Sequence, residues 1–152
     1  MLRRVLIATL VLTALAGCTP SATPTPDVVP VAQPVEFVVG DCIDNSEVDG
    51  EKFSDAVDCS EPHDSEAFAD ITLPDGDYPG QPAIYEEAVT GCESAFYGFV
   101  GVLYNESTIG VTYYYPTSER WAAGDRTILC LAQDAADGEF IESTGSLEGA
   151  AR

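Results

Sequence analysis

Thr127-Ile128-Leu129-Cys130-Leu131-Ala132 is a short, continuous apolar run with a cysteine inside it. A run of this length predicts a central β-strand that is covered on both faces. Residues 83–100 carry apolar side chains at helical spacing, with a proline before them and a glycine after them. We therefore expect a helix that packs across a sheet, with Cys92 of the helix within reach of Cys130 of the strand.

Further segments around this core also favour β-strands. They are short, rich in apolar or β-branched residues and bounded by turn residues: 37–43, 53–59, 66–73 and 111–115. The polar stretch 44–51 is expected to form the turn between the first two strands. The predicted fold is an α+β domain, with a small, mostly antiparallel sheet of about five strands, one packed helix and two disulfides.

Four cysteines lie in this domain: Cys42, Cys59, Cys92 and Cys130. An even number in an exported domain predicts two disulfides, and four cysteines allow three pairings. The expected segments favour Cys42–Cys59 and Cys92–Cys130, because a turn joins the first two and the helix packs on the strand of the last. Each bridge should contribute about 2–4 kcal/mol.

The fifth cysteine, Cys18, follows a segment typical of an export signal. Arg3 and Arg4 are followed by an apolar run over 5–16, which is too short to cross about 30 Å of bilayer hydrocarbon comfortably. The ending Leu15-Ala16-Gly17-Cys18 resembles a bacterial lipobox. This resemblance implies that residues 1–17 are removed and that Cys18 becomes a lipidated N-terminus. The alternative is an ordinary secretory signal with an incidental cysteine.

Residues 18–34 contain half of the prolines of the chain and are expected to form a tether. A proline-rich segment extends about 3.1 Å per residue, so the tether could hold the domain up to roughly 50 Å from the bilayer. We expect the globular domain over residues 35–149. The predicted location is the extracytoplasmic face of the plasma membrane, with the protein held by its lipid.

The chain is strongly acidic, with 6 basic and 26 acidic residues among 152 and a net charge of −20. Removal of residues 1–17 would take away two arginines, and four minus 26 gives −22. This charge argues against nucleic acid, which is bound through clustered lysine and arginine. It also repels anionic lipid headgroups, so the lipid anchor alone is expected to contact the membrane.

Several local patterns are spread over residues 39–149. They are Val39-Gly40-Asp41-Cys42, the block from Val57 to Glu66, Cys92 with Phe96, the stretch from Trp121 to Arg126 leading to Cys130, and Gly145-Ser146-Leu147. In combination they resemble the septum formation family of exported actinobacterial proteins. The resemblance implies a role in cell division or envelope growth and brings no set of catalytic residues with it.

His63 is the only histidine, and Asp64 and Glu66 lie beside it. An envelope hydrolase would use His63 as a base and Ser60 as a nucleophile, but such close neighbours in sequence rarely reach triad geometry. A metal site would need nearby cysteines as thiolates, whereas an exported domain oxidises them. We therefore expect no catalytic site, metal or cofactor, and an imidazole that bonds to the backbone or to a carboxylate.

Aromatic residues suggest a possible ligand surface. Trp121 and Arg126 could hold a sugar ring and a carboxylate, although a core tryptophan and an internal ion pair are the commoner roles. Tyr113 and Tyr115 share one face of their strand, and Tyr114 points to the other. An exposed pair of tyrosines could stack on glycan, and half-buried strand tyrosines are the alternative.

These features favour a lipid-anchored binding module of the bacterial envelope whose partners are envelope proteins, division proteins or wall polymer. His63 is counted with the tyrosines, Trp121 and Arg126 among the candidate ligand residues. The alternatives are the hydrolase described above and a structural envelope component without a defined ligand.

Overall fold

A computed structural model describes residues 37–152. The expected signal segment (1–17), the lipidated Cys18 and the tether (18–34) lie outside the described residues. Neither helix in the described part of the chain combines the length and apolarity that a membrane crossing requires.

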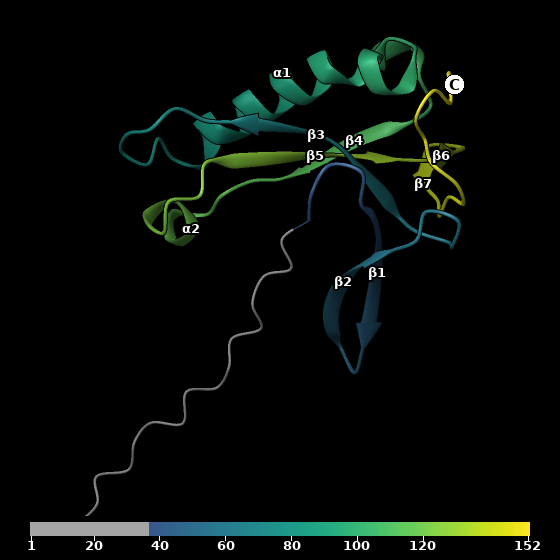
Figure 1. Ribbon diagram of the computed structural model, residues 1–152, viewed down its shortest axis with the longest axis horizontal. Helices are drawn as coiled ribbons and strands as arrows, with labels where there is room; N and C mark the ends of the chain where they lie inside the picture. The colour runs from purple at the N-terminus through teal and green to yellow at the C-terminus, as the bar shows by residue number, and fades with distance from the viewer. Residues whose placement is uncertain (1–36) are drawn as a thin grey trace, which may run out of the picture. The chain divides into compact units, whose positions relative to one another are not determined.

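Five antiparallel strands form the main sheet (Figure 1). Their order is β2-β1-β3-β5-β4, and their bounds are β1 Cys42–Val48, β2 Glu51–Val57, β3 Ser65–Thr72, β4 Gly110–Tyr114 and β5 Thr127–Gln133. The apolar run of β5 lies between β3 and β4 and is buried from Ile128 to Ala132. The predicted central strand is therefore confirmed.

Helix α1, Gln81–Val100, covers one face of this sheet (Figure 1). Its fully buried stripe is Ile84, Ala88, Cys92, Phe96 and Val100. The stripe packs in one cluster with side chains of β3 and β5, so the predicted α+β architecture is confirmed. The helix ends at Gly101, whose left-handed backbone (φ 93°) lets its N–H bond to the carbonyl of Tyr97.

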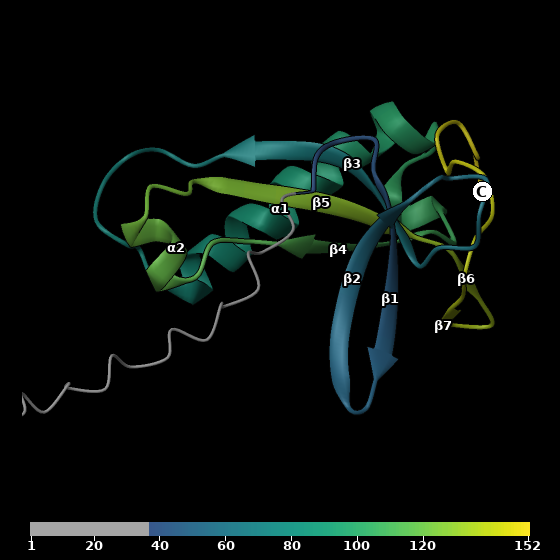
Figure 2. The same cartoon turned by 60° about the horizontal axis from the view of Figure 1, so that its bottom comes forward.

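The opposite side of the sheet, which we call the open face, is not covered by α1. Figure 2 views this side, with α1 behind the strands. Successive residues of β5 point to opposite faces of the sheet. Ile128 and Cys130 belong to the cluster under α1, whereas Leu129 and Leu131 belong to a small cluster on the open face. Phe37, which precedes β1, packs against this second cluster.

Strands β1 and β2 form a longer hairpin than the sequence predicts. Residues 44–51, expected as a polar turn, continue both strands, and the turn itself is Asp49-Gly50. Positive φ angles of 54° and 84° at these two residues are those of a type I′ turn, which favours Asp-Gly. Residues 37–41, expected as strand, instead form a turn in which the Val38 N–H bonds to the Asp41 carboxylate.

Both predicted disulfides are present. Cys42–Cys59 links the start of β1 to the loop after β2, with a Cα–Cα distance of 5.2 Å. Cys92–Cys130 links α1 to the central strand, with a Cα–Cα distance of 5.5 Å. The preferred pairing is therefore confirmed, and the second bridge ties the two layers of the fold together.

Several short elements were not predicted. They are the 3-10 turn η1 Tyr104–Glu106, helix α2 Ser118–Ala122, and the small hairpin of β6 Ala135–Ala136 with β7 Glu139–Phe140. The chain then returns across the end of α1, where the N–H groups of Gly149 and Ala151 bond to the carbonyls of Phe99 and Val100. Leu147 of this last segment packs into the hydrophobic cluster under α1.

Candidate functional site

His63 is fully buried and makes internal hydrogen bonds through both ring nitrogens. Its Nδ1 lies 2.9 Å from the carbonyl oxygen of Glu61, and its Nε2 lies 3.1 Å from the hydroxyl of Ser143. Because a carbonyl can only accept, Nδ1 donates to Glu61 and Nε2 can accept from Ser143. The backbones of His63 and Ser143 also exchange two hydrogen bonds. The ring is thus placed to join two chain segments, away from any exposed surface.

Two acidic neighbours of His63 have the same kind of role. The buried Glu66 carboxylate accepts from the Leu147 N–H at 2.6 Å and from the Ser146 hydroxyl at 2.8 Å. Asp64 accepts from the Asn45 N–H of β1 at 2.7 Å. These carboxylates fix the closing segment and the first hairpin to the start of β3.

Ser60, the nucleophile of the hydrolase alternative, is bonded to Asp58. Its N–H and its hydroxyl both donate to the same carboxylate oxygen of Asp58, at 2.9 and 2.8 Å, and these bonds lower the pKa of Asp58. The Gly145 N–H closes the same region by donating to the Cys59 carbonyl at 2.6 Å. The motifs around Cys59 and Gly145 therefore lie side by side, joined by a backbone hydrogen bond.

Cys42, Cys59 and Glu66 offer the one group of metal-type ligand atoms found within residues 37–152, with these atoms within 4.8 Å of one another. Both sulfur atoms are joined in a disulfide, so neither is a thiolate that could hold a metal. The Glu66 carboxylate is meanwhile bonded to the closing segment. The arrangement is a disulfide, buried at Cys42 and half-buried at Cys59, beside a hydrogen-bonded carboxylate.

Trp121 and Arg126 contact each other and hold the loop between β3 and α1. The Arg126 guanidinium lies 3.9 Å above the indole ring and donates to the Trp121 carbonyl at 2.7 Å. The indole N–H donates to the Gly76 carbonyl at 3.0 Å, and Arg126 pairs with Asp75 at 3.4 Å. Because the indole is buried and one of its faces is covered by Arg126, it offers no platform for a sugar ring.

The three consecutive tyrosines of β4 divide between the two faces as predicted. Tyr113 and Tyr115 lie on the helix side, where the Tyr113 ring is 5.6 Å from that of Tyr85 and the Tyr115 hydroxyl accepts from Gln81 at 2.7 Å. Burial, followed by the contact with Tyr85, raises the pKa of Tyr113. Tyr114 is 41% exposed and belongs to the open face.

Tyr114 forms an aromatic pair with Phe37, which sequence analysis did not single out. The ring centroids are 5.9 Å apart and the planes are only 22° from parallel. At this separation the rings are offset, so their faces do not cover each other completely. Phe37 precedes the first strand and lies 77 positions from Tyr114, so no local pattern connects the two residues.

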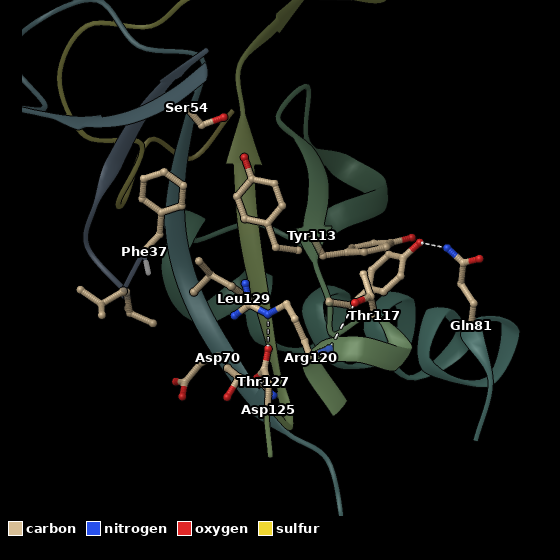
Figure 3. A pocket seen from close by; sticks show the side chains of 14 residues that line it. Phe37, Ser54, Asp70, Gln81, Tyr113, Thr117, Arg120, Asp125, Thr127 and Leu129 are labelled. Carbon is tan, nitrogen blue, oxygen red and sulfur yellow. Dashed lines mark hydrogen bonds and ion pairs between the residues drawn. The ribbon is translucent and has the colours of Figure 1, made fainter. Parts of the chain in front are cut away.

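This pair lines a groove of about 910 Å³, which we call the open-face groove (Figure 3). Its volume is typical of ligand sites, which occupy about 300–1,000 Å³. Segments far apart in the sequence contribute to it: Phe37 before β1, Ser54 of β2, Asp70 of β3, Tyr114 of β4, Arg120 of α2 and Leu129 of β5. Tyr113 and Tyr115 also line it, together with Gln81 of α1, whereas His63, Trp121 and Arg126 are not among its lining residues.

The charged groups of the open-face groove leave it negative. Arg120 Nε pairs with the Asp125 carboxylate at 2.7 Å, as the dashed line in Figure 3 shows, so the positive charge is already matched. The other oxygen of Asp125 accepts from the Thr127 N–H. Asp70 is exposed, and no ion pair to it occurs in the described residues.

Comparison with known proteins identifies the family. The family model described as septum formation matches residues 25–130, which is well over half of the chain and includes all four disulfide cysteines. Searches of the curated proteins and of the solved structures found no match. The chain belongs to the septum formation family.

Proposed function

We propose that this protein is a binding module of the cell envelope that acts in septum formation, and that its partner binds in the open-face groove. Family membership supports the role in septum formation or the envelope. The observation that carries the choice of surface is the exposed Tyr114 beside Phe37, which itself packs on the apolar cluster that contains Leu129. Val38 and Val39, also exposed, extend this apolar lining.

The proposal includes attachment to the extracytoplasmic face of the plasma membrane. The lipobox-like ending at Cys18 and the proline-rich tether that follows it support this location. Two acyl chains on Cys18 would hold the protein stably, and the acidic domain would stay clear of anionic lipid.

Binding, rather than hydrolysis, is favoured by the state of the candidate catalytic residues. Both nitrogens of His63 have internal partners and the ring is fully buried, so the base of the hydrolase alternative does not reach a substrate. Ser60 bonds to Asp58 instead of His63. The groove, by contrast, is open, and it extends from the face that α1 leaves uncovered to Gln81 at the start of α1.

The test is the position of the tagged full-length protein in growing cells. The variant Tyr114→Ala is compared with Tyr97→Ala, which removes an exposed tyrosine from α1. We expect the wild type and Tyr97→Ala to concentrate at division sites and Tyr114→Ala to spread over the membrane at equal abundance.

A uniform wild-type signal would argue against the septal role, and an unchanged Tyr114→Ala would argue against the groove. Cys18→Ala tests the anchor in the same cells. Its release into the medium is expected if the lipid holds the protein, and its retention at the membrane would contradict the anchor.

A further inference from the structure

We infer that the open-face groove binds a positively charged peptide segment that also carries apolar side chains, supplied by a partner protein. This inference rests on the proposed function, because it names the chemistry of the partner for the same groove.

The described domain has almost no free positive charge. Residues 37–152 contain 4 basic and 24 acidic residues, and four minus 24 gives −20. Arg120, Arg126 and Arg152 each pair with an aspartate, at 2.7, 3.4 and 2.5 Å. Lys52 stands opposite Glu47 in the hairpin register. A negative field of this size attracts cationic segments and repels anionic ones.

The groove itself combines apolar and negative groups. The ring of Phe37 and the exposed side chains of Val38 and Val39 offer apolar surface. The exposed ring of Tyr114 can receive an ammonium or guanidinium group on its face. Asp70 supplies a carboxylate at the rim of the same groove (Figure 3). Lysine or arginine alternating with an aliphatic residue would match this set.

The same features disfavour other ligands. An anionic wall polymer would need a free cation, and Arg120 is held by Asp125. A neutral glycan could stack on Phe37 and Tyr114 and donate its hydroxyls to Asp70, but it would gain nothing from the net negative charge of the domain. A basic peptide is the class that uses the aromatic surface, the carboxylate and the negative field together.

The experiment measures binding of the purified full-length protein to a fluorescein-labelled hexapeptide of alternating lysine and leucine, by fluorescence anisotropy. The comparison probes are a hexapeptide of alternating glutamate and leucine, and unlabelled chitotetraose as a neutral glycan competitor. We expect the lysine peptide to bind, the glutamate peptide to bind at least about tenfold more weakly because of charge repulsion, and chitotetraose not to compete.

Two pairs of variants separate the groove from the overall charge. Asp70→Asn should weaken binding of the lysine peptide about threefold. Glu93→Gln removes the same charge from the exposed side of α1 and should change the affinity by less than about 1.5-fold. Tyr114→Ala should weaken binding about fivefold through loss of the ring face, and Tyr97→Ala should leave it unchanged. All four residues are exposed, and equal urea midpoints confirm that the variants fold.

Equal weakening by Asp70→Asn and Glu93→Gln would show attraction by net charge alone and would overturn the inference. Binding of chitotetraose that Tyr114→Ala abolishes would also overturn it, while leaving the groove as the binding surface. A division-site signal that Tyr114→Ala does not change would overturn the proposed function itself. The localisation test and the peptide-binding test therefore fail in distinguishable ways.

Discussion

Replacing His63 with alanine should destabilise the domain without affecting the open-face groove. The substitution removes a fully buried ring and both of its hydrogen bonds, to Glu61 and to Ser143. Leaving the buried Ser143 hydroxyl without its partner costs about 1–3 kcal/mol, and the cavity left by the ring costs about 1–2 kcal/mol more. We therefore expect a loss of about 3 kcal/mol in the free energy of unfolding, which is large for one substitution.

The assay is urea unfolding of the full-length protein, followed by the fluorescence of Trp121. This residue is the only tryptophan and is 6% exposed, so its emission reports the loss of the fold. With a slope of about 1–3 kcal/mol per molar urea, a loss of about 3 kcal/mol lowers the midpoint by at least about 1 M.

Ser143→Ala and the double variant complete a thermodynamic cycle for this pair. We expect the two substitutions to be non-additive by about 1 kcal/mol, because the second removes a partner that is already missing. The reasoning would be refuted if His63→Ala left the midpoint unchanged and abolished localisation at division sites. That result would make His63 a functional group and not a structural one.

Three further predictions follow from the packing of the domain. Replacing both Cys92 and Cys130 with alanine should cost about 4 kcal/mol, and the Cys42/Cys59 double variant about 3 kcal/mol, because the bridges close separations of 38 and 17 residues. The opposite order in urea unfolding would contradict this estimate. Gly98→Ala should raise the free energy of unfolding by about 1 kcal/mol, since the added methyl group meets no neighbour in α1. Gly91→Ala should bring no such gain, because its Cβ would lie 2.1 Å from Ile71 Cδ1 of β3. An equal rise in the melting temperature of the two variants would argue against this packing. The raised pKa of Tyr113 should make it ionise at a higher pH than a free tyrosine in an ultraviolet titration. Since its pKa is raised in the folded state, the free energy of unfolding should fall as pH rises above about 10, where the unfolded chain releases the proton first. Tyr113→Phe should reduce this fall, and an identical pH dependence in the variant would contradict the raised pKa.

The sheet, the helix and the disulfides were predictable because burial leaves a periodic signal. The continuous run of β5 is buried on both faces, and every fourth residue of α1 from Ile84 to Phe96 faces the core. These two signals also place Cys92 near Cys130. The hairpin of β1 and β2 lacks such a signal, because many of its side chains are exposed and polar. Its length depends instead on the local turn at Asp49-Gly50.

The open-face groove as a whole was not predictable, although Tyr113 and Tyr115, two of the predicted ligand residues, line it. Reactive side chains such as His63, Trp121 and Arg126 attract attention in a sequence, yet their polar groups here bind other parts of the domain. Tyr114 was assigned correctly to the face opposite Tyr113, but its partner Phe37 comes from outside any strand. Tertiary packing alone brings these two rings together.

Photo-crosslinking in growing cells tests the central claim most directly. A benzophenone amino acid replaces Tyr114 in the full-length protein, and the same group at Tyr97 of α1 serves as the matched control. We predict a discrete crosslinked protein from position 114 that Asp70→Asn diminishes and that position 97 does not produce. Equal products from both positions, or a product from position 97 alone, would contradict the claim that the open-face groove holds the partner.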